Sequence, residues 1–334
     1  MRVSKVKERQ TKTSKMGRAV VLVAIVAVLI AAQALASAAP KRPATVPADY
    51  VITPFGYFHP SCVNHLAKGD VLLKDEKAIQ HANGKADKIP ACAYPRYEAD
   101  GEEVTGDVQV VNPPSIGHSW VEYVSTTTTS AFGALDDTWI VPPPPKNDAG
   151  QTLYFFPGLE QASNDVTILQ PVLGWNSDFS SSWGIASWNC CMNGATNEGP
   201  PLPVNPGDEI IGQISNTCGP PPHANKKCPT WNVFAIDNTI ELLDGISYAA
   251  GLTETSNYGQ SFNWAFSGAM EVYNVVQCGD YPSSTRILFY ELGLFNYKFV
   301  GVSPKWTGSV VSGLTPQCGY GSGMRSQTTL DFAP

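Results

Sequence analysis

Short β-forming segments separated by proline and glycine breakers fill the chain from about residue 118, and this pattern constrains the fold most strongly. Asp137–Val141, for example, ends at the breaker Pro142–Pro145. No stretch of this half sustains the apolar period of an amphipathic helix. The pattern predicts an all-β domain, either a sandwich or a barrel. The expected strands are Ser119–Val124, Asp137–Val141, Thr152–Phe156, Val166–Leu173, Trp183–Trp188, Glu209–Ser215, Trp231–Ile236, Ser261–Phe266, Ala269–Val276 and Arg286–Leu294.

The N-terminus has the order of a secretory signal peptide. Seven Lys or Arg and one acid, Glu8, precede an apolar run from Ala19 to Ile30, and small residues follow. We therefore expect residues 1–38 to be a signal peptide, a mature chain that begins near Ser37 or Ala39, and a secreted, extracellular protein. An uncleaved membrane anchor is the alternative, since the apolar stretch extended through Ala39 is about long enough to span a bilayer.

Residues 39–115 differ from the β-rich remainder at 116–334. They are mixed and polar, they hold three of the five histidines, and Lys74–His81 is a candidate helix. Two interpretations stay open for this disulfide-pinned segment: a propeptide, whose basic residues Lys74, Lys77, Lys85 and Lys88 mask an acidic cleft, or a structural subdomain. No Gly/Ser linker divides the strands after residue 150, which favours one β-sandwich domain.

Charge excludes two classes of partner. Without the leader, Lys plus Arg falls from 22 to 15 and Asp plus Glu from 29 to 28, so the mature chain has a net charge near −13. Nucleic acid and anionic membranes are therefore poor partners.

Eight cysteines in an exported chain predict disulfides, because the compartment is oxidising and the count is even. Cys62 and Cys92 are the sole pair before residue 100, Cys218 and Cys228 bracket a proline-rich loop, and Cys278 and Cys318 lie near the C-terminus; Cys190 and Cys191 are adjacent and hardest to place. Zinc is the rival interpretation, but no cysteine pair has the two-residue spacing of zinc ribbons. We expect no metal and no cofactor.

Two polar residues interrupt apolar strands. Gln170 lies within Val166–Leu173, and Glu271 lies within Ala269–Val276. A buried polar group costs free energy unless something uses it, so both are candidate functional residues; a solvent-facing position on a half-exposed strand is the alternative for each.

A series of short motifs from Trp120 to Asn296 resembles the eqolisins, the secreted glutamic peptidases related to scytalidoglutamic peptidase. In order they are the opening SWVEY, the strand end at Trp139–Pro142, YFFPGLE, Ile168-Leu169-Gln170, the Pro206-Gly207-Asp208 turn and AMEVYNVVQC. The resemblance covers about two thirds of the chain. After Gln170 this chain has Pro171, and its next strand reads WGIASWNCC where the family has a more acidic, tyrosine-rich strand.

The resemblance implies a concanavalin A-like sandwich of two large antiparallel sheets and an acid-acting endopeptidase with a polypeptide substrate. It places the catalytic glutamate at Glu271 and the catalytic glutamine at Gln170. Glu271 would act as general base and then general acid, and the Gln170 amide would bind the oxyanion. Trp120, Trp175 and Trp188 are the predicted substrate-binding residues.

Three other functions stay open. A non-catalytic concanavalin-like module would bind glycan or protein at the cell surface, using tryptophans for stacking. A glycosidase needs two neighbouring carboxylates, and only Glu291 on the next strand is a candidate partner for Glu271. A Ser-His-Asp hydrolase fits least, since the sequence has no Gly-x-Ser-x-Gly elbow and only His118 and His223 fall in the β domain.

Overall fold

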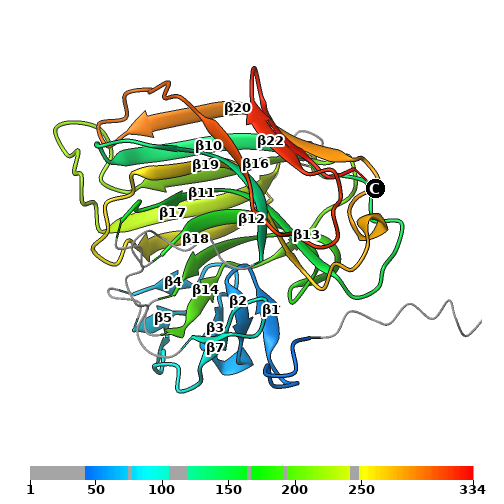
Figure 1. Cartoon of the computed structure of the whole chain (residues 1–334). Coiled ribbons are helices and arrows are strands. Elements are labelled where there is room, and N and C mark those ends of the chain that lie inside the picture. The colour runs from blue at the N-terminus through cyan, green and yellow to red at the C-terminus, as the bar shows by residue number, and fades with distance from the viewer. Residues whose placement is uncertain are drawn as a thin grey trace, which may run out of the picture. The chain divides into compact units, whose positions relative to one another are not determined.

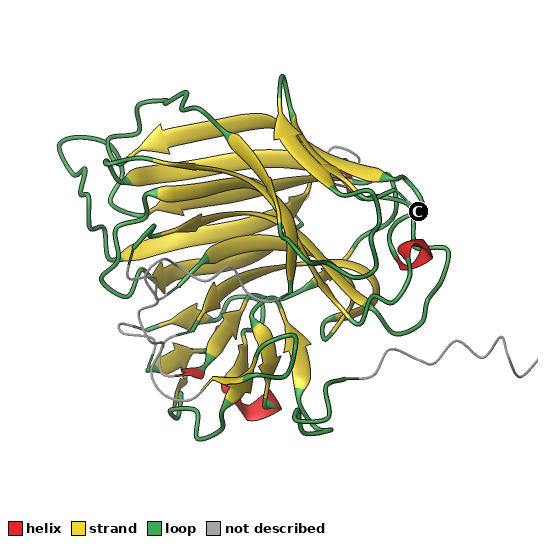
Figure 2. Cartoon of the chain, in the orientation of Figure 1, coloured by secondary structure: helices red, strands yellow, loops and turns green. Residues whose placement is uncertain are grey.

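The computed structural model describes residues 42–73, 77–104, 119–163, 167–191, 194–240 and 248–333. These residues form one compact unit. The described residues are almost entirely β-strand and loop, as Figure 2 shows. The predicted all-β antiparallel sandwich is therefore confirmed.

One large sheet has nine strands in the order β21-β9-β19-β11-β12-β13-β14-β3, with β15 also paired to β13. Its long central strands pair antiparallel, whereas β14 and β3 pair parallel. The strands are β3 (Val63–His65), β9 (Trp120–Thr127), β11 (Thr152–Glu160), β12 (Leu169–Ser177), β13 (Ser180–Cys190), β14 (Thr196–Glu198), β15 (Leu202–Pro203), β19 (Trp264–Tyr273) and β21 (Thr307–Val310).

The second large sheet has seven strands in the order β18-β17-β16-β10-β20-β23-β22. Its strands are β10 (Phe132–Ile140), β16 (Glu209–Asn216), β17 (Thr230–Asp237), β18 (Ala249–Ser256), β20 (Arg286–Asn296), β22 (Gly321–Met324) and β23 (Thr328–Asp331). In β16 and β17, half-buried and buried residues alternate, which is the period-two pattern of a sheet with one face on a core.

The core between the two large sheets is apolar. Phe155 and Leu173 of the nine-stranded sheet belong to the same buried cluster as Trp139, Ile210 and Phe289 of the seven-stranded sheet. Burial of such side chains is the main stabilising contribution to the sandwich. We call the side of the nine-stranded sheet that faces this core the inner face, and the opposite side the outer face.

The N-terminal segment, residues 42–104, packs on the outer face. Its side chains Tyr57, Phe58 and Val63 share a buried cluster with Tyr154 and Trp188 of the sandwich. Figure 1 draws this segment in blue and cyan beside the lower strands of the sandwich. Its elements are β1 (Val51–Thr53), β2 (Gly56–Phe58), η1 (Pro60–Cys62), β4 (Val71–Leu72), β5 (Ala78–Gln80), β6 (Ala86–Lys88), β7 (Arg96–Tyr97) and β8 (Glu103–Val104); the other short helix, η4, is Cys278–Asp280.

Three features of the strand map differ from the sequence prediction. Residues 78–80 form strand β5, not a helix, because they pair with β4 and β6. The expected strands Ser261–Phe266 and Ala269–Val276 are one strand, β19, with a bulge between Phe266 and Ala269. Strands β14, β15 and β18, the C-terminal strands β21 to β23 and the short strands of residues 42–104 were not predicted.

All eight cysteines form disulfides, as their even number predicted, and the structure gives the pairing that the sequence left open: Cys62–Cys92, Cys218–Cys228, Cys278–Cys318 and the adjacent Cys190–Cys191. The first lies within the N-terminal segment, and the third links two loops near the C-terminus.

Among the described residues, none of the helices has the length and apolar character needed to cross a lipid bilayer.

Candidate active site

Strand pairing places Gln170 and Glu271 on the same face of the same sheet. Glu271 of β19 lies opposite Tyr154 of β11, which lies opposite Gly174 of β12. Directly opposed residues project from the same side of a sheet, and residues 170 and 174 are an even number apart on β12. Gln170 and Glu271 therefore both project from the outer face.

The two residues are nevertheless offset along the strands. Leu169 pairs with Leu159, so Gln170 lies level with Gly158, four residues from Tyr154 on β11. Two strand spacings and four residues along a strand separate the two Cα atoms by roughly 16 Å. No hydrogen bond joins the side chains: Glu271 is bonded to Ser119 and Tyr273.

Glu271 is fully buried and held by two hydroxyl groups. The Ser119 hydroxyl donates to its Oε1 at 2.6 Å and the Tyr273 hydroxyl donates to the same oxygen at 2.5 Å, while Oε2 has no partner among the described residues. Burial raises the pKa of Glu271 to about 8, against the lowering effect of the two hydroxyl groups. Glu98 of the N-terminal segment adds a smaller raising effect. The carboxyl group is therefore protonated at acidic and neutral pH in this arrangement.

Gln170 is the most unusual polar residue of the outer face. Its side chain is fully buried, and neither Nε2 nor Oε1 has a hydrogen-bond partner among the described residues. Its cross-strand neighbour on β13 is Trp188, and its neighbour on β11, Gly158, has no side chain to offer. An unsatisfied buried amide destabilises a fold by about 1–3 kcal/mol, so Gln170 is not there for stability.

The three predicted substrate-binding tryptophans fall on both faces. Trp120 lies opposite Glu271, and Trp188 lies opposite Gln170, both on the outer face. Trp175 pairs with Leu153 and packs against Trp183 in the core between the sheets. It is five residues from Gln170, and an odd spacing on a strand leads to the opposite face. The structure therefore brings Trp120 and Trp188 to the candidate site and does not bring Trp175.

Aromatic side chains of the N-terminal segment cover this face. Phe55 contacts Trp188 edge to face, with ring centroids 6.0 Å apart, and Tyr57 contacts Tyr273 in the same way at 5.6 Å. The Tyr154 hydroxyl donates to the backbone oxygen of Ile52 at 3.0 Å. Ring packing and this hydrogen bond hold the segment over both candidate residues.

The predicted electrostatic mask has no counterpart in the lysines that the structure describes. Lys77, Lys85 and Lys88 are exposed, and Lys85 pairs with Asp87 of its own segment at 2.8 Å. Lys74 lies outside the described residues.

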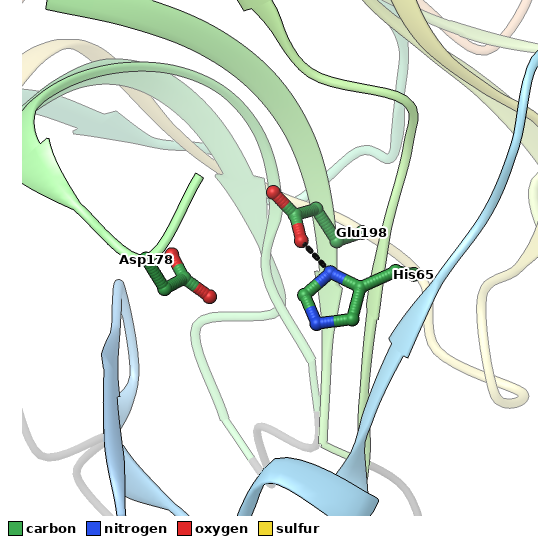
Figure 3. Close-up of side chains that lie close together, drawn as sticks. All are labelled: His65, Asp178 and Glu198. Atoms are coloured by element: carbon green, nitrogen blue, oxygen red, sulfur yellow. Dashed lines mark hydrogen bonds and ion pairs between the residues drawn. The ribbon is translucent and has the colours of Figure 1, made fainter. Parts of the chain in front are cut away.

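A second polar cluster, which the sequence reasoning missed, lies at the end of the row of paired residues that runs from Gln170 across β13 and β14 to β3. Trp188 pairs with Glu198 of β14, and Glu198 pairs with His65 of β3. The Nδ1 atom of His65 is hydrogen-bonded to Oε2 of Glu198, and Asp178 from the turn between β12 and β13 lies beside them (Figure 3). Burial raises the pKa of Glu198, and its hydrogen bond to His65 opposes that shift. Among the residues that the structure describes, these three form a group whose ligand atoms lie close enough together to hold a metal ion.

No protein-family model and no curated protein sequence matches the chain. Solved structures that are similar include scytalido-glutamic peptidase with a peptide-based transition state analog, at 13% identity and a TM-score of 0.43. Another is SCP-B, a member of the eqolisin family of peptidases, in complex with the tripeptide Ala-Ile-His, at 13% identity and a TM-score of 0.42. Each comparison covers 64% of this chain and 98% of the other. This chain is thus distantly similar to eqolisin structures.

Proposed function

We propose that the protein is a secreted, acid-acting endopeptidase of the glutamic type, with its active site on the outer face of the nine-stranded sheet. The observation that carries this proposal is the amide of Gln170, buried without a partner on the same face as the buried carboxyl group of Glu271. Burial of an unused donor and acceptor is costly, and a substrate carbonyl oxygen would give the donor its partner.

In the proposed reaction, the carboxylate of Glu271 takes a proton from a water molecule, and the water oxygen adds to the carbonyl carbon of the peptide. The Gln170 Nε2–H donates a hydrogen bond to the oxyanion that forms. Protonated Glu271 then gives its proton to the leaving nitrogen, and the C–N bond breaks. The products are a carboxylic acid and an amine, and the Glu271 carboxylate is restored.

The two residues do not reach each other directly. Side chains on one face of a sheet project away from it, so the offset of roughly 16 Å between the Cα atoms keeps their polar ends well apart. Tyr154 and Phe156 of β11, both buried on the outer face, lie between them. The pair would therefore act through the bound peptide and not through a direct contact.

We further propose that residues 39–115 act as a propeptide. Phe55, Tyr57 and Ile52 occupy the outer face where a substrate would lie. With the segment in place, Glu271 stays protonated and cannot act as a base. Its removal would admit water, lower the pKa of Glu271 and free Trp120 and Trp188 to bind substrate side chains.

The test is cleavage of denatured casein between pH 2 and 7 by the protein after acid treatment and removal of residues 39–115. Glu271→Gln and Gln170→Ala are each expected to lower the rate at least a hundredfold. Glu122→Gln is the matched control, because Glu122 is equally buried in the same sheet but lies opposite Met270 of the inner face. An inert wild type, or equal rates in all variants, would contradict the proposal.

The second candidate function is a non-catalytic module that binds glycan or protein through the same face. The lack of direct contact between Gln170 and Glu271 favours it. Specific binding of a glycan or polypeptide by the protein without residues 39–115, lost in Trp188→Ala and unchanged in Glu271→Gln, together with no casein cleavage at any pH, would support this function over the first.

A further inference from the structure

The cluster of His65, Asp178 and Glu198 joins three segments that are far apart in the sequence. His65 ends β3 in the N-terminal segment, Glu198 ends β14, and Asp178 lies in the turn between β12 and β13. Parallel pairing of β3 with β14 sets His65 opposite Glu198. In Figure 3 a carboxylate oxygen of Asp178 points toward the imidazole of His65, whose Nδ1 is hydrogen-bonded to Glu198. One ligand atom from each residue lies within 4.8 Å of the other two.

The cluster is incompletely satisfied by the protein itself. The side chain of Glu198 has no exposed surface, and its Oε1 has no hydrogen-bond partner among the described residues. Two carboxylates and one imidazole therefore share a space in which a buried oxygen lacks a donor. A buried anionic oxygen without a donor is costly, and a cation would compensate it.

We propose that His65, Asp178 and Glu198 bind a divalent cation of the zinc class. One imidazole nitrogen and two carboxylate oxygens are a ligand set that Zn²⁺ accepts, with a fourth position open to water. Ca²⁺ and Mg²⁺ prefer oxygen ligands alone, and more of them, so they fit this set less well. Ligand atoms about 2.0–2.2 Å from a common ion lie roughly 3.3–3.6 Å apart, so binding would draw the three ligand atoms together from their present separations of up to 4.8 Å.

The ion would link the N-terminal segment to the sandwich. His65 belongs to β3 of the N-terminal segment, whereas Glu198 belongs to β14 and Asp178 to the turn between β12 and β13 of the sandwich. The side chain of His65 is 56% exposed, so the site is open to ions from solvent. Occupancy would stabilise the covered state without taking part in hydrolysis, and the proposal stands whether or not the protein is a peptidase.

A second histidine–carboxylate cluster provides a matched control. His81 is bonded to Asp70 at Nδ1 (3.0 Å) and to Asp87 at Nε2 (3.2 Å). Its two carboxylates contact opposite edges of the ring, so they do not converge on one nitrogen. We expect no cation site there.

The experiment is calorimetric titration of the metal-stripped full chain with Zn²⁺ and, separately, with Ca²⁺. We expect one Zn²⁺ per chain, binding at least tenfold weaker in His65→Ala and in Asp178→Asn, unchanged binding in His81→Ala, and no Ca²⁺ binding. Zn²⁺ should also raise the Tm of the wild type and not that of His65→Ala, since a ligand stabilises only the state that binds it. Circular dichroism checks that each variant is folded.

Direct spectroscopy covers the case in which a variant does not fold. Co²⁺ in place of Zn²⁺ should give the visible absorption of a four-coordinate site in the wild-type chain, and Zn²⁺ should displace it. Absence of Zn²⁺ binding, equal binding in wild type and in folded His65→Ala, or preference for Ca²⁺ would overturn the proposal.

Discussion

Asn189 and Gln170, on opposite faces of the nine-stranded sheet, differ in how their buried amide groups are satisfied. On the inner face, Asn189 donates to the Thr255 hydroxyl at 2.6 Å and to the Ser256 backbone oxygen at 2.9 Å, and accepts from Thr167. On the outer face, one residue further along the same strand pair, Gln170 has no protein partner among the described residues. The amide of Asn189 is thus satisfied within the protein, whereas Gln170 and Glu198, like Glu122 of the inner face, have buried polar atoms without a partner among the described residues.

Replacement of Asn189 should have the largest effect on stability. Asn189→Leu removes the partner of Thr167 and Thr255 and leaves their hydroxyl groups buried in the core. The expected loss in the free energy of unfolding is about 3 kcal/mol. Urea denaturation measures this free energy of unfolding. A loss below about 1 kcal/mol would remove the distinction between Asn189 and Gln170.

Acidity should favour the folded state. Burial raises the pKa of Glu122 to about 9 and those of Glu271 and Asp137 to about 8, above their ordinary values. The folded state therefore keeps protons that the unfolded chain releases, so these groups stabilise the fold fully below about pH 4 and progressively lose that contribution up to about pH 9.

Thermal unfolding between pH 4 and 9 tests this pH dependence, with an expected loss on the order of 2 kcal/mol per buried acid. Glu122→Gln on the inner face and Glu271→Gln on the outer face should each reduce the dependence of the Tm on pH. Maximal stability at pH 8 would contradict the expected direction.

Loss of Phe55 should weaken the cover of the outer face. Phe55→Ala removes the edge-to-face contact with Trp188, which is worth about 1 kcal/mol beyond the area that it buries. We expect faster proteolysis of residues 42–104 and stronger acrylamide quenching of tryptophan fluorescence. Val300→Ala, at an exposed residue of the seven-stranded sheet region, serves as the control.

Replacement of Gln170 should have the smallest effect on stability, although it abolishes the proposed activity. Gln170→Leu exchanges an unsatisfied amide for an apolar side chain of similar size, so the free energy of unfolding should change by less than about 1 kcal/mol, or rise. A loss above about 2 kcal/mol would mean that the amide has a structural partner, for instance a bound water.

Much of the fold was predictable because strand alternation and breakers are local signals. The strands around Leu153, Ile185 and Ile210 fall where apolar and β-branched residues cluster. Strand β18 was missed because Ala249–Ser256 is polar and rich in small residues, and β19 was divided in two because Ser267 and Gly268 interrupt its apolar run. Tertiary pairing with β17 and β11 stabilises these strands despite weak local preference.

The candidate site was only partly predictable. Gln170 and Glu271 stood out as polar residues in apolar strands, and alternation alone assigns Trp175 to the face opposite Gln170. Glu198 gave no such signal, because β14 is three residues long and entirely polar.

By itself, the sequence determined that the chain is built mainly from β-strands and that its cysteines form disulfides, because strand period is a local signal and an even cysteine count in an exported chain indicates pairing. Only the tertiary structure decided that Gln170 and Glu271 share the outer face, that residues 42–104 cover it, and that His65 meets Asp178 and Glu198. Each of these depends on the register between strands that are distant in the sequence, and a shift of one residue in that register would turn every side chain to the other face.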